Sequence, residues 1–362
     1  MPRTSSNLKS EINMNEFGSD FHYVSGFQGV GNTLHDFYPH ANYYADGRQA
    51  LIHLYHSQGW QRLWMPVYFC YDVIASQKEA GLNLKFYKDC PGDPDESKTL
   101  EDILSKGLFR PTDAVLRVNY YGARSCRNTD KLPVAAVVED HTHDLIGDWP
   151  THSTADWCIA SLRKTLPIPE GGILWSPMGL KLPKAPNSSS ENEHIATTRW
   201  SAMKLKARYL AGESVEKDEF RKGYLDTEDF FDHAPVCALD KAGLEYIKTF
   251  DVRGWYDQKR NNWELLRDIN KEGVRVITPE CADCYSFSLV LVFDNPDERD
   301  RVRKALIEHQ IYPAVLWNVP GTIGCEALDF SRRMLSIHCD GRYANDEIME
   351  MKSVIESILF NH

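Results

Sequence analysis

The sequence of 362 residues contains no hydrophobic run that approaches the length of a membrane span. Its longest apolar stretches, at Val134–Val138 and Leu289–Phe293, are far shorter than the roughly 20 residues that a transmembrane helix needs. The N-terminus also lacks the apolar segment of a secretory signal. We therefore expect neither membrane insertion nor secretion.

Basic residues and paired cysteines are also scarce. The 41 Lys and Arg against 52 Asp and Glu give a formal net charge of −11, which disfavours nucleic acid as a partner. Nine cysteines, an odd number without paired spacing, are typical of reduced thiols in a cytoplasmic protein. Cys281 and Cys284 form a lone CxxC, which we interpret as a chance pair near a loop.

Strand-like and helix-like segments alternate along most of the chain. Hydrophobic residues at 42% and charged residues at 26% are ordinary globular values. The alternation predicts an α/β fold with parallel strands and helices on both faces of the sheet. From Leu239 to Ile269 we expect a long helix, broken near Arg253–Gly254, followed by a compact α+β unit. The predicted parts are an N-terminal arm at 1–45, a large α/β domain at 46–235 and a smaller C-terminal domain at 236–362.

Asp140 and Lys164 form the most informative pair of residues. Asp140 ends the apolar run AAVVED, at the strand end where open α/β sheets place their ligands. Lys164 follows the next strand, in a turn rich in Pro and Gly. A lysine there could form a Schiff base, and an aspartate could hold a protonated ring nitrogen; pyridoxal phosphate needs both groups. The alternative interpretations are a solvated turn lysine and a helix-capping aspartate.

A phosphate site is also predicted. Gly47, Arg48 and Gln49 open a helix, so their free N–H groups and the positive end of the helix dipole would face an anion. Ser161, three residues before Lys164, could add a hydroxyl to the same phosphate.

Two further contacts to a cofactor ring are expected. His143, three residues after Asp140, could reach the ring oxygen or its neighbourhood. One of three aromatic residues could cover a face of the ring, and the sequence does not choose among Tyr68, Phe69 and Tyr71. We expect no metal site: His141 and His143 are two apart on an irregular segment without a neighbouring Cys or Glu cluster, and Glu139 is expected to be structural.

The order of these motifs resembles the DegT/DnrJ/EryC1/StrS family of pyridoxal-phosphate aminotransferases. The resemblance runs from about Tyr44 to the end and is weakest between Pro183 and Leu239. It implies a large domain of the aspartate-aminotransferase type (fold type I), with a mostly parallel seven-stranded sheet, and a smaller C-terminal α+β domain. The motifs that carry it are GRQAL, LWMPVYFC, VNYYG, VVEDHTHDL and SLRKTLPIPEGG, in that order, followed by SFSLVLVFDNPDERDRVRKALIEHQIYPAVLW and LSIHCDGRY.

The resemblance also implies roles for individual residues. Lys164 would carry the aldimine and shuttle the proton, and Asp140 would pair with the pyridinium nitrogen. The other implied cofactor-binding positions are Gly47, Arg48, Gln49, Tyr71, Asn119, His143 and Ser161.

The sequence departs from the family pattern at three of these points. Arg48 stands where a small hydroxyl residue is common, Ser161 and Lys164 are closer together than usual, and Phe69-Cys70 replaces the usual Thr-Phe or Thr-Trp pair. Arg163 is an alternative contact to the phosphate or the substrate.

The expected function is amino transfer from a donor such as glutamate to a keto acceptor such as a nucleotide-linked keto-sugar. The resemblance implies a homodimer, with residues near Pro183–Asp232 or on the helix with Arg253, Arg260 and Asn261 reaching the partner's site. The alternatives are another pyridoxal-phosphate reaction on an amino acid or natural-product intermediate, cofactor binding without turnover, and a binding protein in which Lys164 and Asp140 are unrelated.

Overall fold

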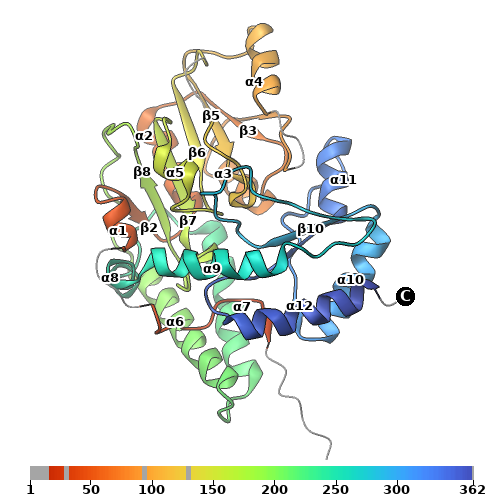
Figure 1. The fold of residues 1–362 in the computed structure, drawn as a ribbon. Coiled ribbons are helices and arrows are strands. Elements are labelled where there is room, and N and C mark those ends of the chain that lie inside the picture. The colour runs from red at the N-terminus through yellow and green to blue at the C-terminus, as the bar shows by residue number, and fades with distance from the viewer. Residues whose placement is uncertain (1–15, 28–31, 92–95, 128–131, 361–362) are drawn as a thin grey trace, which may run out of the picture.

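The computed structural model describes residues 16–27, 32–91, 96–127 and 132–360. A mixed seven-stranded sheet lies at the centre of the large part of the molecule, and its α/β architecture confirms the predicted fold class (Figure 1). In spatial order its strands are β2 (Asn42–Tyr44), β8 (Gly172–Trp175), β7 (Trp157–Ser161), β6 (Ala136–Asp140), β5 (Asp113–Val118), β3 (Arg62–Pro66) and β4 (Leu84–Tyr87).

The direction of the strands brings three chain segments to one edge of this sheet. Strands β4, β3, β5, β6 and β7 are parallel neighbours, whereas β8 pairs antiparallel with β7 and β2 pairs antiparallel with β8. Asp140, the last residue of β6, is in register with Val118 of β5 and Ile159 of β7. The residues that follow β5, β6 and β7 therefore meet at the carboxyl edge, where open α/β sheets bind ligands.

Helices cover both faces of the sheet. Helix α2 begins where the Asp46 carboxylate accepts a hydrogen bond from the N–H of Arg48, and it ends at Gly59, whose left-handed conformation suits glycine. Its buried residues, such as Leu51 and Leu54, join the main core. The helices of this part are α1 (Leu34–Phe37), α2 (Gly47–Gln58), α3 (Tyr71–Glu79), α4 (Glu96–Ser105), α5 (Asp148–His152), α6 (Ser190–Leu210) and α7 (Lys217–His233).

Two of these helices differ from the sequence-based expectation. The polar stretch PNSSSENEH has the composition of an exposed loop, but α6 begins within it at Ser190, because the Ser189 hydroxyl caps the N–H of Asn192. Helix α7 was not foreseen, and it packs antiparallel to α6 below the sheet in Figure 1.

The C-terminal part is built on a three-stranded antiparallel sheet, in the order β12 (Met334–Ile337), β10 (Leu289–Phe293), β9 (Val274–Val276). The expected long helix is two helices, α8 (Lys241–Thr249) and α9 (Val252–Leu266). The break lies slightly before the predicted position, because Asp251 caps α9 through the N–H of Gly254. Helices α10 (Pro296–Glu308), α11 (Cys325–Arg333) and α12 (Asn345–Phe360) complete this part. The domain limits near residues 45 and 235 remain predictions.

The N-terminal segment connects the two parts of the molecule. Strand β1 (Phe17–Gly18) pairs with β11 (Ile311–Tyr312) of the C-terminal part. The next residues are held by Lys206 of α6, whose ammonium donates hydrogen bonds to the Ser19 hydroxyl and the Asp20 carbonyl. No helix in the described part of the chain is both long and apolar enough to span a bilayer.

The expectation of reduced cysteines was wrong for one pair. Cys281 and Cys284 form a disulfide, because the turn between them brings their Cα atoms to 5.5 Å, inside the range that a disulfide bridges. The thiols of Cys70, Cys90, Cys126, Cys158, Cys237 and Cys339 are free.

Candidate functional site

A cavity of about 290 Å³ opens at the carboxyl edge of the large sheet. Its walls come from the N-terminus of α2, the ends of β5, β6 and β7, the turn after β7, helix α7 and two segments of the C-terminal part. Residues far apart in the sequence therefore meet there. The residues named from the sequence that line it are Gly47, Arg48, Phe69, Cys70, Asn119, Asp140, His143, Ser161, Arg163 and Lys164.

Lys164 projects into this cavity from the short 3-10 turn that follows β7. Its side chain is accessible from the cavity, and its ammonium forms no hydrogen bond or ion pair with the described residues. The neighbouring Arg163 guanidinium and the dense protein around the cavity lower the pKa of Lys164 to about 8. A much larger share of this amine is therefore neutral, and so nucleophilic, near neutral pH than for an ordinary lysine.

Asp140 lies in the floor of the cavity. Its Oδ1 accepts a hydrogen bond of 2.8 Å from the N–H of Thr142. Burial raises the pKa of Asp140, because no cation forms an ion pair with it among the described residues. The position thus favours a ligand that brings a positive charge to this carboxylate.

His143 forms a wall of the cavity as a neutral imidazole. Burial, with the charges of Lys259 and Lys164, lowers its pKa to about 3. Its Nδ1 accepts a hydrogen bond of 2.9 Å from the N–H of Tyr121, so the ring proton lies on Nε2. The imidazole stacks on the rings of Tyr121 and Trp317, with interplanar angles of 9° and 18°. These contacts fix a flat polar ring at the cavity wall.

Asn119 follows β5 and presents an unused donor. Its Oδ1 accepts a hydrogen bond from the N–H of Arg124, whereas its buried Nδ2 has no hydrogen-bond partner among the described residues. Since a buried donor without a partner is costly, this amide favours a ligand oxygen in the cavity.

The N-terminus of α2 closes another end of the cavity. A Cβ added at Gly47 would lie 2.9 Å from the backbone of Ser161, so only glycine allows the helix to approach β7 this closely. The Arg48 guanidinium pairs with Asp232 at 2.5 Å and with Asp46 at 3.5 Å. The N–H of Arg48 donates to the Asp46 carboxylate, so the expectation that this N–H is free for an anion was wrong. The guanidinium is the group that Arg48 presents at this end of the cavity.

Two of the predicted cofactor-binding residues do not face the cavity. The side-chain Oε1 of Gln49 accepts a hydrogen bond from the N–H of Cys237, because helix geometry turns it towards the core. The Tyr71 hydroxyl bonds the carbonyl of Val67 at the start of α3. Neither residue lines this cavity, and their contacts to a cofactor remain predictions. Of the three candidate ring-covering residues, Phe69 lines the cavity.

The lining residues that sequence reasoning missed include two carboxylates and two aromatic side chains from later segments of the chain. Glu228 and Asp232 come from α7, and Phe287 and Trp317 come from the C-terminal part. The polar segment that contains α7 was considered as a contributor to a partner's site, but in this structure its carboxylates face the cavity of the same chain. No local pattern singles out these residues, since only the tertiary fold brings them there.

A second polar cluster lies on the other side of β6. Glu139, His141 and Cys158 offer ligand atoms within 4.8 Å of one another and are buried. The argument that His141 has no Cys or Glu neighbour was therefore wrong, because β7 brings Cys158 beside β6. The cluster is already joined internally: the Glu139 carboxylate contacts the His141 ring at 3.1 Å and accepts a hydrogen bond of 2.6 Å from Ser153.

Comparisons with known proteins place this geometry in context. Neither a scan of protein-family models nor a search of curated protein sequences finds a match. Solved structures match at low identity. Spr1654 of Streptococcus pneumoniae, named as a sugar aminotransferase and determined in its PLP form, is similar with a TM-score of 0.60 and 12% identity over 95% of this chain and 100% of that chain.

Two other solved structures are similar over comparable lengths. PseC of Helicobacter pylori, an aminotransferase involved in pseudoaminic acid biosynthesis, gives a TM-score of 0.58 at 13% identity over 96% of this chain and 100% of that chain. A DegT DnrJ EryC1 StrS aminotransferase from Brucella abortus gives 0.55 at 13% identity over 93% and 92%. The chain therefore has the fold of the DegT/DnrJ/EryC1/StrS-type sugar aminotransferases.

Proposed function

We propose that this protein is a pyridoxal-phosphate-dependent aminotransferase. It moves an amino group from a donor such as glutamate to a keto acceptor, for which we propose a nucleotide-linked keto-sugar. The observation that carries the proposal is the joint placement of Lys164, Asp140 and Asn119 on one cavity that ends at a helix N-terminus. The fold shared with sugar aminotransferases supports it.

The residues present fit the cofactor. Asp140 would hold the pyridine nitrogen, and the unpartnered Nδ2 of Asn119 would donate to the ring oxygen. Arg48 and Ser161 would hold the phosphate, next to the point where α2 approaches β7 closely at Gly47. Asp46 and Asp232 already pair with the Arg48 guanidinium. When bound, pyridoxal phosphate supplies an electron sink that makes the carbon–hydrogen bond next to the amine acidic.

The remaining steps belong to side chains of this chain. Lys164 would bind the cofactor through its Nζ and, once released, would move a proton at that atom as a general acid and base. Its accessible amine and its pKa of about 8 suit both tasks. His143 and Trp317 would exclude water from one side of the ring. The implied homodimer remains a prediction.

The half-reaction with glutamate tests this function. Pyridoxal phosphate is added to the protein, its visible spectrum is recorded, and glutamate is then supplied without an acceptor. We expect the band of the lysine-bound cofactor to disappear while 2-oxoglutarate is released in an amount equal to the sites. A band that persists with every amino donor tested, with no keto acid released, would contradict amino transfer.

The pH dependence of cofactor capture is a second expected result. Only neutral Lys164 reacts with an aldehyde, so the capture rate should rise about tenfold per pH unit below pH 8 and level off above it. Because Arg163 is the largest cause of the lowered pKa, Arg163→Gln should move the midpoint to higher pH. Stopped-flow absorbance measures the capture rate of both proteins across the pH range. Because ionisation of the free cofactor affects both proteins equally, the difference between their midpoints reports on Lys164. An unchanged midpoint would contradict the assigned cause.

Gly47→Ala tests the close approach at the phosphate end. The added Cβ would meet the Ser161 backbone at 2.9 Å, so α2 must shift away from β7. We expect affinity for pyridoxal phosphate to fall about tenfold or more, which a titration of the visible band measures. Gly321→Ala is the matched control, because an added Cβ there meets no atom within 4 Å. Equal affinities in the two variants would refute a role for the close approach at Gly47 in phosphate binding.

A further inference from the structure

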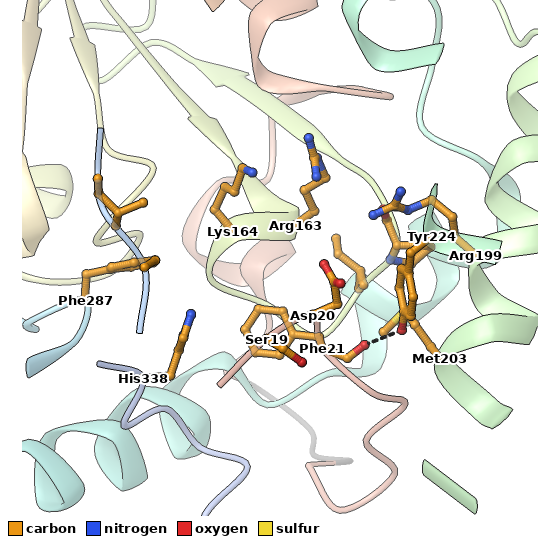
Figure 2. A pocket seen from close by; sticks show the side chains of 14 residues that line it. Ser19, Asp20, Phe21, Arg163, Lys164, Arg199, Met203, Tyr224, Phe287 and His338 are labelled. Atoms are coloured by element: carbon orange, nitrogen blue, oxygen red, sulfur yellow. Dashed lines mark hydrogen bonds between the residues drawn. The ribbon is translucent and has the colours of Figure 1, made fainter. Parts of the chain in front are cut away.

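Lys164 also lines a second cavity, of about 280 Å³. Figure 2 shows Lys164, Arg163 and Arg199 along one side of it, with the N-terminal residues Ser19–Phe21 across from them. The two cavities share Arg163, Lys164, Phe287 and Leu316, so a molecule in the second one can reach the amine of Lys164. Its volume lies at the lower end of small-molecule pockets and suits an amino acid better than a nucleotide-linked sugar.

Two buried arginines that line this cavity, Arg163 and Arg199, converge on one carboxylate, that of Glu228, which itself lines the first cavity. Glu228 of α7 accepts from Arg163 Nη2 at 3.1 Å and from Arg199 Nη1 at 3.0 Å. The arginine side chains are only 8% and 4% exposed, whereas that of Glu228 is 50% exposed. Arg163 and Arg199 therefore already bind a carboxylate. Because the Glu228 side chain is half exposed, it can turn towards solvent.

The guanidinium groups are positioned independently of Glu228. Both lie over the ring of Phe231, at 4.8 Å and 5.2 Å from its centre. Arg199 also donates to the Pro169 carbonyl and the Thr227 hydroxyl. Arg163 Nη1 and Arg199 Nη2 donate no hydrogen bond to the described residues. These two nitrogens therefore remain as donors for the oxygens of a ligand carboxylate. Such a prearranged pair of guanidinium groups matches the geometry of carboxylates.

The charges around the arginine pair disfavour an additional anion while Glu228 stays in place. Asp46 lies 3.5 Å from Arg163 Nε, and the exposed Asp20 faces the same cavity, so an added anion would meet three carboxylates if Glu228 stayed. Arg163 and Arg199 lower the pKa of Glu228 to about 2, so it is a charged competitor at every ordinary pH. Displacement by a substrate carboxylate keeps the number of charges at the pair unchanged.

We propose that Arg163 and Arg199 form the carboxylate subsite for a dicarboxylic amino donor, and that Glu228 occupies this subsite until the donor displaces it. The proposal rests on the proposed aminotransferase function and names the class of its donor. The diphosphate of a nucleotide-linked acceptor is the other possible anion at this subsite. The experiment below distinguishes it from a carboxylate.

The test measures binding of unreactive anions by calorimetry to the protein loaded with pyridoxal phosphate. Glutarate serves as a dicarboxylate that cannot transfer an amine, and UDP serves as a nucleoside diphosphate. We expect glutarate to bind the wild type, several-fold tighter to Glu228→Gln, and about tenfold or more weaker to Arg199→Lys, which keeps the charge but loses the planar fork. Arg208→Lys, on an exposed arginine of the same helix that pairs with Glu213, is the control and should match the wild type.

The outcomes are distinct. Because Arg199 does not line the first cavity, Arg199→Lys should keep the visible band of the bound cofactor, which separates this proposal from the function on which it rests. Glutarate binding that neither variant changes would overturn the subsite. Binding of UDP in place of glutarate, weakened by Arg199→Lys, would overturn the carboxylate class. A glutamate half-reaction whose KM rises in Arg199→Lys, with its maximal rate largely kept, would support it.

Discussion

Lys164→Ala is expected to abolish the visible band of the bound cofactor and to reduce amino transfer by at least about 10³-fold. The reason is that this variant removes an amine with a lowered pKa that faces the cavity and has no hydrogen bond or ion pair within the described part of the chain. Absorbance after addition of pyridoxal phosphate and release of 2-oxoglutarate from glutamate measure the two effects. Lys181→Ala is the matched control, because Lys181 is exposed and does not line the cavity.

The assignment requires that Lys164→Ala and Lys181→Ala differ in the visible band and in the rate of amino transfer. Both proteins should show the same far-ultraviolet circular dichroism, since neither side chain packs in a core cluster. A Lys164→Ala protein with an undiminished band and unchanged turnover would exclude Lys164 as the residue that carries the cofactor.

Asp140→Asn should have the second largest effect. We expect affinity for pyridoxal phosphate and the rate of the glutamate half-reaction each to fall about 10²- to 10³-fold, because a protonated ring nitrogen would lose its buried counter-charge. Burial raises the pKa of Asp140, so the carboxylate is unfavourable in the protein without its cofactor. The melting temperature of the cofactor-free variant should therefore equal or exceed that of the wild type.

The two readouts together identify the role of Asp140. A cofactor titration and a thermal melt of the same preparation are sufficient. If Asp140→Asn binds the cofactor as tightly as wild type, the carboxylate does not face a cation. If the cofactor-free variant is strongly destabilised, Asp140 is a structural residue, and its capping contact with Thr142 is its main contribution.

The sequence was sufficient to predict elements with a strong local signal. The β6 strand begins as a short apolar run and ends in Glu139 and Asp140, and α2 begins at the predicted glycine. Because parallel strands share one carboxyl edge, their terminal residues could be placed together without a structure. The gathering of Asn119, Asp140 and Lys164 on one cavity follows from that topology.

Contacts between distant segments could not be predicted in the same way. Helix α7 lies in a polar stretch, and its placement of Glu228 beside Arg163 depends on how α7 packs against α6. The side chains of Gln49 and Tyr71 point away from the cavity lining, because helix phase and a local hydrogen bond, rather than residue type, decide their direction. The Cys281–Cys284 bridge depends on the turn geometry of a loop, which composition does not report.

The most direct test of the central claim is to identify which lysine holds the cofactor. The protein is incubated with pyridoxal phosphate, reduced with borohydride, digested and mapped by mass spectrometry. The account predicts a pyridoxyl group on the peptide that contains Lys164. Lys206 and Lys259 are informative competitors, because burial also lowers their pKa values to about 8. A label on either of them, or no label at all, would contradict the account.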